Sequence, residues 1–247
     1  MTEGAWTEFR APYRVRFDEA GPDGLLRTSG LLRYAQDVAW IHSVARGFDR
    51  AWYRERDLNW VVRAVDLEVL GAISLGVTLD ATTRVVGHRR VWARRMGEFR
   101  LGDELLARVR TDWLLLDGSN RPTRMPAEFA GAFATLSAGD AVGRVDLPEV
   151  PPAAHRTPIR VRPHELDPMD HVNNATYLDW FEEAVAGAPH GSASVRQLPR
   201  RIRLEYAGAA EPGASVVAIT WSERDRWFHR LESASGGVLL RATLEPG

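Results

Sequence analysis

Two stretches of the chain carry apolar residues three and four positions apart. They cover about residues 29–47 and 173–187, and each pattern predicts one long helix with a buried stripe. The stripe positions are Leu31, Tyr34, Ala35, Val38, Ile41 and Ala45 in the first helix, and Tyr177, Leu178, Phe181, Ala184, Val185 and Ala188 in the second.

Segments rich in Val, Leu, Ile and Trp, punctuated by turn residues, predict strands around these helices. One short strand precedes each helix, at about 10–17 and 157–163. Four strands follow each helix, at 59–70, 75–86, 90–100 and 104–116 and then at 197–207, 214–223, 226–235 and 238–245. A long helix followed by antiparallel strands is an α+β pattern, and the sheet must wrap the helix to bury its stripe.

The two halves repeat each other in order. Arg14-Val15-Arg16 matches Arg160-Val161-Arg162, and the same offset pairs Glu19 with Glu165 and Tyr34 with Trp180. Further matches follow along the chain at shorter offsets. We therefore predict a duplicated domain at 1–136 and 156–247, joined by a Gly/Pro/Ala-rich linker at 137–155.

The amino-acid composition excludes several classes of binding site and catalytic mechanism. The 45% hydrophobic fraction can form a core, and 32 basic residues against 33 acidic ones argue against general nucleic-acid binding. The chain has no cysteine and no lysine, which excludes thiolate catalysis, cysteine zinc sites and Schiff-base chemistry. The seven histidines are scattered without metal-ligand spacing, so we expect neither metal nor cofactor.

No basic stretch followed by an apolar run opens the sequence, and no run approaches 18 uncharged apolar residues. From these observations we expect a cytoplasmic protein with no signal peptide and no membrane span.

The most informative segment is Glu165-Leu-Asp-Pro-Met-Asp-His-Val-Asn-Asn-Ala-Thr-Tyr177. Asp167 lies before a proline in the loop that enters the second helix, where a carboxylate can act as base on water or attack an acyl carbon. His171 and the first N–H groups of the helix can donate to a developing oxyanion. An Asx turn, a helix cap or a purely structural histidine would explain the same residues.

This segment resembles the hotdog-fold thioesterases, which read D-x-x-x-H-V-N-N-x-x-Y at this place. With the duplication, and with segments such as Trp40-Ile-His-Ser-Val-Ala-Arg-Gly and Leu58-Asn-Trp-Val-Val-Arg in the first copy, the chain resembles the acyl-ACP thioesterases. The resemblance implies a tandem (double) hotdog fold and hydrolysis of fatty acyl-ACP in fatty-acid biosynthesis. The implied partner is acyl carrier protein bearing a 4'-phosphopantetheine-linked acyl chain.

Asp167 and His171 are the predicted catalytic residues, and the first copy serves as an internal control for them. There Gly21 and Leu25 occupy the matching positions, which predicts one active site, in the second copy, while the first copy binds the acyl chain.

The chain also departs from the plant-type pattern. Met169 and Ala209 stand where that family has an asparagine and a glutamate. Asn173 and Asn174 are candidates for support or for capping the helix. Glu182 is the first substitute for the missing acid, with an ion pair as its other interpretation.

Predicted substrate contacts are Trp60 for the acyl chain, Met169 through its backbone, and Arg94 and Arg95 for an acidic carrier or its phosphate. Core packing for the tryptophan and a solvated sheet edge for the arginines are the alternatives. An acyl-CoA thioesterase, an inactive acyl-binding hotdog protein and a dimer of whole chains stay open. A hotdog dehydratase is disfavoured because no His-Phe-Pro-Gly-like stretch is present.

Overall fold

The computed structural model describes residues 8–133 and 143–247, which fall into two compact units. Unit 1 holds residues 8–63 and 72–133, and unit 2 holds residues 64–71 and 143–247. Of the linker predicted at 137–155, residues 137–142 lie outside the described residues. Residues 143–154 contain no helix or strand, and His155 begins a strand.

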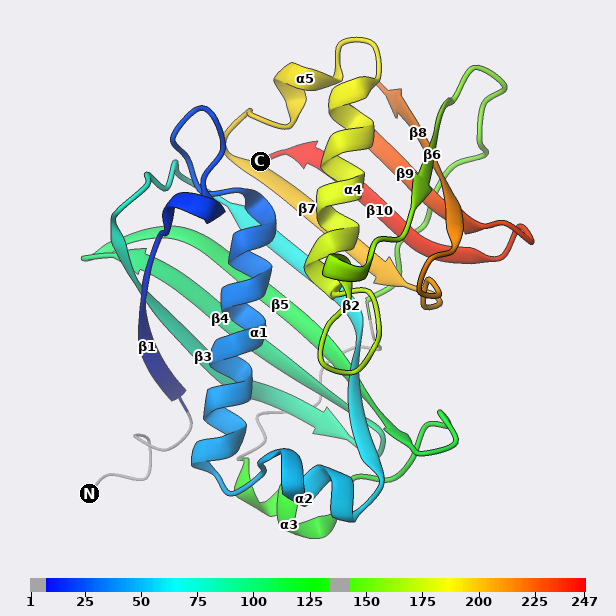
Figure 1. Cartoon of the computed structure of the whole chain (residues 1–247). Coiled ribbons are helices and arrows are strands. Elements are labelled where there is room, and N and C mark those ends of the chain that lie inside the picture. Colours follow the sequence, from blue (N-terminus) through cyan, green and yellow to red (C-terminus); the bar gives the residue numbers. More distant parts are fainter. Residues whose placement is uncertain (1–7, 134–142) are drawn as a thin grey trace. The chain divides into compact units, whose positions relative to one another are not determined.

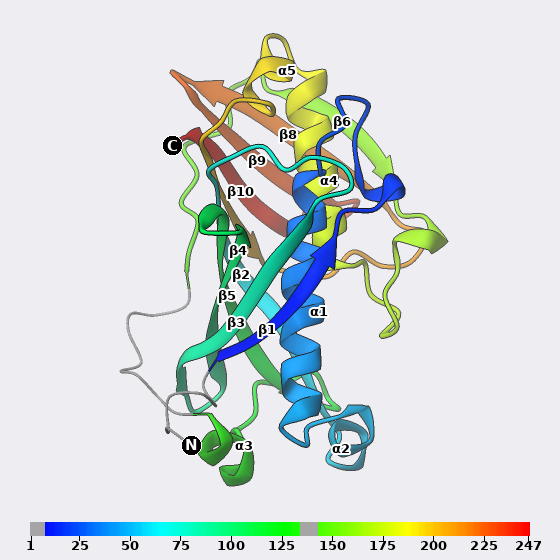
Figure 2. The same cartoon turned by 90° about the vertical axis from the view of Figure 1, so that its left-hand side faces the viewer.

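Unit 1 is an antiparallel sheet that wraps one long helix (Figure 1). Its strand order is β1-β3-β4-β5-β2, and α1 packs against β1, β3 and β5. Figure 2 shows β1 and β3 side by side along α1. The elements are β1 (Glu8–Arg14), α1 (Thr28–Ala45), β2 (Leu58–Val69), β3 (Thr78–Arg89), β4 (Trp92–Leu101) and β5 (Glu104–Asp117).

Unit 2 repeats this arrangement, with strand order β2-β7-β10-β9-β8-β6 and α4 packed against β6 and β8. Its share of β2, Ala64–Val69, pairs with β7, and Asp66 there accepts two hydrogen bonds from Arg201 at 2.8 and 2.7 Å. The elements are β6 (His155–Arg160), α4 (Asn174–Gly187), β7 (Arg200–Tyr206), β8 (Ser215–Glu223), β9 (Arg226–Ser233) and β10 (Val238–Pro246).

The tandem α+β hotdog fold predicted from the sequence is confirmed, since each unit has one central helix within an antiparallel sheet. All six apolar stripe positions of the second helix are buried. In α1 the stripe was partly wrong, because Ile41 is 37% exposed while Ala39 and His42 are buried. The buried face therefore turns toward His42 in the last turns of α1.

Three short helices escaped prediction: α2 (Arg50–Glu55), α3 (Ala127–Ala132) and α5 (Gly191–Ser194). The first two are six residues long and pack by aromatic contacts in unit 1. Phe48 lies 4.8 Å from the rings of both Trp52 and Phe129. Helices this short carry no periodic signal, so tertiary packing decides them. Within the described residues, no helix has both the length and the apolar character needed to cross a membrane.

His229 on β9 is enclosed in the core of unit 2. Its ring lies 4.9 Å from that of Phe181 on α4, and its Nδ1 is 2.9 Å from the hydroxyl of Thr220 on β8. Burial lowers the pKa of His229 to about 3. The folded protein therefore holds this imidazole neutral at pH values where the unfolded chain protonates it.

Acidification should therefore destabilise the protein through His229. The stabilisation is present above the unfolded pKa of about 6.5 and is lost as the pH falls toward 3, by about 2 kcal/mol between pH 7 and pH 5. Urea unfolding at both pH values should show a smaller loss, by about that amount, in His229→Leu. Thr220→Val keeps the histidine and should keep the wild-type loss; an unchanged loss in His229→Leu would contradict the assignment.

Candidate active site

The loop before α4 is a tight turn that carries Asp167 and His171. The backbone N–H of Asp167 donates to the carbonyl of His171 at 2.8 Å, and that of Asp170 donates to the carbonyl of Asp167 at 3.0 Å. Asp170 takes a positive φ of 60°, which aspartate tolerates better than most residues. The two predicted catalytic residues thus lie at the two ends of one five-residue loop.

The Asp167 carboxylate is half-buried, and only one of its two oxygens accepts hydrogen bonds from the described residues. Its Oδ1 accepts hydrogen bonds from the backbone N–H of Met169 at 2.9 Å and of His171 at 3.3 Å. Oδ2 has no hydrogen-bond partner among the described residues. The side chain of His171 is exposed. The loop therefore offers one oriented carboxylate oxygen and one accessible imidazole next to a helix start.

The two asparagines form that helix start. Asn173 is the N-cap of α4, and its side-chain oxygen accepts from the N–H of Ala175 at 2.9 Å. Asn174 is the first helical residue, and its carbonyl accepts from the hydroxyl of Tyr206 at 2.8 Å. The N–H groups of Asn173, Ala175 and Thr176 donate within this segment, whereas that of Asn174 donates to no described residue.

The carboxylate and the carbonyl of Glu165 connect the loop to α4. Its carboxylate accepts from the backbone N–H of Arg162 at 2.6 Å and from the indole of Trp180 on α4 at 3.1 Å. Its carbonyl accepts from the N–H of Asn173 at 2.9 Å. One glutamate therefore fixes the distance between the loop that carries Asp167 and His171 and the start of α4.

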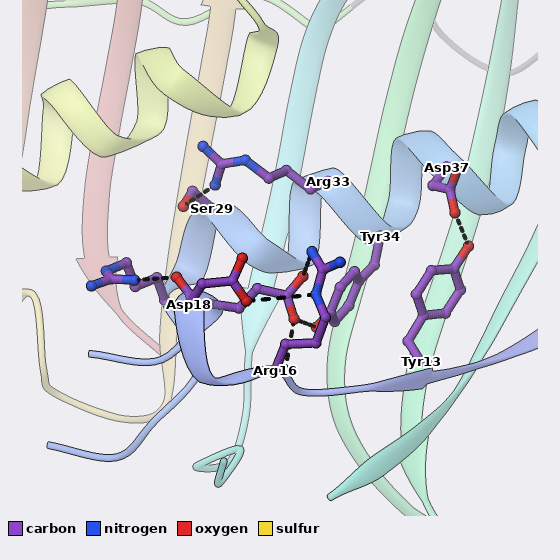
Figure 3. Close-up of polar contacts among 9 residues, drawn as sticks. Tyr13, Arg16, Asp18, Ser29, Arg33, Tyr34 and Asp37 are labelled. Atoms are coloured by element: carbon purple, nitrogen blue, oxygen red, sulfur yellow. Dashed lines mark hydrogen bonds and ion pairs between the residues drawn. The ribbon is translucent and has the colours of Figure 1, made fainter. Parts of the chain in front are cut away.

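Unit 1 contains the same loop with Gly21 and Leu25 in place of Asp167 and His171, and its own carboxylate, that of Asp23, accepts from the N–H of Leu25 at 3.1 Å. The N–H of Gly21 donates to the carbonyl of Leu25 at 2.8 Å, and that of Gly24 donates to the carbonyl of Gly21 at 3.0 Å. Glu19 accepts hydrogen bonds from Arg16 and from the hydroxyl of Tyr34, in the place that Glu165 takes with Arg162 and Trp180. Figure 3 shows the side chains of Arg16 and Tyr34 close to each other in unit 1. The backbone of the turn thus forms without an aspartate or a histidine at these two positions.

Tyr177 and Glu211 are neighbours of the loop that the sequence did not single out as site residues. The Tyr177 hydroxyl accepts from the N–H of Ala210 at 2.8 Å. Burial, together with the negative charges of Asp167 and Glu211, raises the pKa of Tyr177 to about 12. Glu211 therefore acts on the same hydroxyl as Asp167, two residues after the position assigned to the missing family glutamate. Tyr177 belongs to the sequence motif, and that was the signal from which this neighbour of the loop could have been found.

Glu182 forms an ion pair, the alternative role that the sequence offered for it: its Oε1 lies 3.7 Å from Nη2 of Arg200 on β7. The role of Glu182 as a substitute acid stays a prediction.

The predicted substrate contacts are divided between the two units, with Met169 in unit 2 and the other three in unit 1. Met169 is 48% exposed on the loop, and its N–H binds Asp167. The ring of Trp60 lies 5.4 Å from that of Phe129, in the aromatic cluster of unit 1. Arg94 binds Asp112 through two hydrogen bonds of 2.6 and 2.9 Å. Arg95 points to the opposite face of β4 and is buried against α1, so it is no part of a solvated surface.

The described parts of the chain contain no cluster of three or more His, Asp or Glu side chains that could hold a metal ion.

Comparison with known proteins gives matches to two family descriptions. Residues 7–133 match the acyl-ACP thioesterase N-terminal domain, and residues 150–240 match the acyl-ACP thioesterase C-terminal domain. A chloroplastic acyl-[acyl-carrier-protein] hydrolase of Cuphea viscosissima is 26% identical over 259 residues, and a chloroplastic palmitoyl-acyl carrier protein thioesterase of Cuphea hookeriana is 24% identical. These alignments cover 96% of this chain but only about three fifths of each relative, 62% and 61%.

Solved structures share the fold over nearly the whole chain. An acyl-ACP thioesterase from Bacteroides thetaiotaomicron superposes with a TM-score of 0.82 at 14% identity and covers 99% of both chains. The 12:0-ACP thioesterase from Umbellularia californica gives 0.81 at 22% identity and covers 96% of both chains.

The comparison between the two loops predicts that Asp167 and His171 are dispensable for folding. His171→Leu installs the residue found in unit 1, and Asp167→Asn keeps an acceptor oxygen for the two N–H groups. Each should change the free energy of unfolding by no more than about 0.5 kcal/mol, the usual range for surface changes. Urea unfolding at pH 7 measures this; a loss above about 2 kcal/mol would show that the loop depends on these side chains.

Proposed function

Because the chain belongs to the acyl-ACP thioesterase family, we propose that it hydrolyses the thioester between a fatty acyl group and acyl carrier protein. The observation that supports this most directly is the duplicated loop. Both units build the same turn, yet only unit 2 has an aspartate at its first position and a histidine at its last; the carboxylate of the unit 1 turn is that of Asp23, in the middle, where it accepts from the N–H of Leu25 at 3.1 Å. The second carboxylate oxygen of Asp167 and the exposed imidazole of His171 take no part in the hydrogen bonds of the turn, so both are available for chemistry at the helix start.

In the proposed reaction Asp167 handles the nucleophile. With Oδ1 held by the backbone N–H groups of Met169 and His171, Oδ2 can take a proton from water as the water attacks the thioester carbonyl. The same oxygen can instead attack the carbonyl to give an acyl-enzyme anhydride, which water then hydrolyses. In both routes the carbon–sulfur bond breaks, the thiol leaves on the carrier, and the fatty acid is released.

The developing oxyanion would be stabilised at the start of α4. The N–H of Asn174 is the backbone donor left unused there, and the exposed imidazole of His171 precedes it by three residues. The positive end of the helix dipole lies at the same place. Asn173 serves this site indirectly, because capping Ala175 keeps the helix start ordered.

The thiol carrier is the finer part of the proposal. Acyl carrier protein is favoured over coenzyme A by the family and by what its Cuphea relatives are named for. Hydrolysis rates on the same acyl group carried by either thiol separate the two, and a clear preference for the coenzyme A ester would reject the carrier-protein assignment. Absence of turnover on both would support an acyl-binding protein that lacks catalysis.

Asp167→Asn is the sharpest test of the reaction, since it keeps the loop hydrogen bonds and removes the base. Turnover of acyl-ACP should fall by roughly 10²-fold or more, the scale of a lost general base. Asp170→Asn is the matched control three residues away, in a position where asparagine accepts the positive φ, and should retain near wild-type turnover. Equal activity of the two folded variants would remove Asp167 from the mechanism.

His171→Ala tests the oxyanion role. Loss of such a donor lowers kcat by about 10²–10³ with a smaller effect on KM. His164→Ala changes another exposed histidine just before the loop and should leave both constants near wild type. Should His171→Ala instead raise KM at unchanged kcat, the histidine would be a binding residue.

A further inference from the structure

Tyr177 has a hydroxyl proton that forms no hydrogen bond within the described part of the chain. The residue lies in the first turn of α4, and only 3% of it is exposed. Its hydroxyl oxygen accepts from the N–H of Ala210 at 2.8 Å, but no described residue accepts the hydroxyl proton. A buried donor without an acceptor costs free energy, so its presence in a folded protein points to a partner outside the chain.

The fold itself does not need this hydroxyl. The offset that aligns the first residue of α1 with the first residue of α4 pairs Tyr177 with Leu31. Leu31 is buried at the matching place in unit 1, although it has no polar group. The hydroxyl therefore has the same distribution between the two units as the side chains of Asp167 and His171.

The ring of Tyr177 lies beside the start of α4. Side chains of a helix point back toward its N-terminus, so a long side chain in the first turn covers the helix start. Two contacts of Tyr206 agree with this direction. Its ring lies 5.5 Å from that of Tyr177, and its hydroxyl donates to the carbonyl of Asn174, the first helical residue, at 2.8 Å.

The hydroxyl of Tyr177 and the carboxylate of Asp167 are close enough to interact electrostatically. Burial, together with the charges of Asp167 and Glu211, raises the pKa of Tyr177 to about 12, so the phenol keeps its proton at neutral pH. No hydrogen bond joins these two side chains, and Oδ2 of Asp167 has no partner among the described residues. One donor and one acceptor are thus left over, which is the pair that a bridging water satisfies.

We propose that Tyr177 positions the water that attacks the thioester, by donating its hydroxyl hydrogen to the water oxygen. The same water donates one hydrogen to Oδ2 of Asp167 and directs its remaining lone pair at the acyl carbon. The N–H of Ala210 holds the phenol oxygen in place and strengthens the phenol as a donor.

The step balances without a change of charge on the tyrosine. As the carbon–oxygen bond forms, the water proton moves to Oδ2 of Asp167, and Tyr177 keeps its own proton. When the tetrahedral intermediate collapses, the carbon–sulfur bond breaks and the proton passes from Asp167 to the departing sulfur. This role rests on the proposed function, in the route in which Asp167 acts as a base.

Tyr177→Phe removes the hydroxyl and keeps the ring. The kcat on acyl-ACP should fall about tenfold, the scale of one hydrogen bond lost from the transition state, while KM stays near the wild-type value. Tyr34→Phe is the matched control, because it removes the hydroxyl of a buried tyrosine on the central helix of unit 1, where that hydroxyl donates to Glu19. The control should leave kcat and KM near wild type.

Two tyrosine analogues separate the donor from the acceptor. 4-Aminophenylalanine at position 177 keeps N–H donors and should keep most of the turnover. 4-Methoxyphenylalanine keeps an acceptor oxygen for the N–H of Ala210 but has no proton to donate, so its kcat should be as low as that of Tyr177→Phe. A role confined to holding Ala210 predicts the reverse order, and the two analogues decide the question if Tyr177→Phe does not fold.

The outcomes separate this inference from the proposed function. Loss of turnover in Tyr177→Phe that the amino analogue restores supports the inference. An active wild type with equal kcat in Tyr177→Phe overturns the inference alone, as does turnover kept by the methoxy analogue and lost by the amino analogue. A wild type that hydrolyses neither acyl-ACP nor acyl-CoA rejects the proposed function, and the inference with it.

Discussion

The loop that carries Asp167 and His171 is held in place by one residue, Glu165. Its carboxylate joins Arg162, two residues after β6 ends, to the indole of Trp180 on α4, and its carbonyl accepts from the N–H of Asn173. The segment between Glu165 and Asn173, which carries Asp167 and His171, is therefore held at both ends. Glu19 does the same in unit 1, where no chemistry is proposed. The contacts of this glutamate are therefore a property of the fold in both units, and the proposed reaction relies on them in unit 2 only.

The sequence predicted the long helices and strands well, because their hydrophobic patterns extend over many residues. The second helix had its whole stripe buried, and every long strand of the described residues lay within a few residues of its predicted position. In α1 the stripe was wrong after Val38, because Ile41 and Ala45 are exposed whereas His42 is buried, where burial lowers its pKa and keeps its ring neutral. The short helices α2 and α3 depend on distant aromatic partners that no local pattern records.

The sequence predicted the reactive side chains of the candidate site, but not the backbone hydrogen-bond donors or the residues that surround them. Asp167 and His171 follow from a motif, but the unused N–H of Asn174 emerges only once the hydrogen bonds of the helix start are known. Glu211 was ranked behind Glu182 as a substitute acid because Glu182 lies on the central helix. Arg95 was read together with Arg94, yet strand alternation sends one to Asp112 and the other under α1, which separates their chemistry.

The turn of unit 1 has the same backbone hydrogen bonds as the turn that carries Asp167 and His171. Gly21 has no positive φ, but a Cβ added there would lie 2.9 Å from Oδ1 of Asp23, which accepts from the N–H of Leu25, so the Asp23 side chain would have to move. An aspartate at 21 and a histidine at 25 would then stand on a backbone already hydrogen-bonded as in unit 2. At this place the two units therefore differ by the exchange of a few side chains on a retained turn.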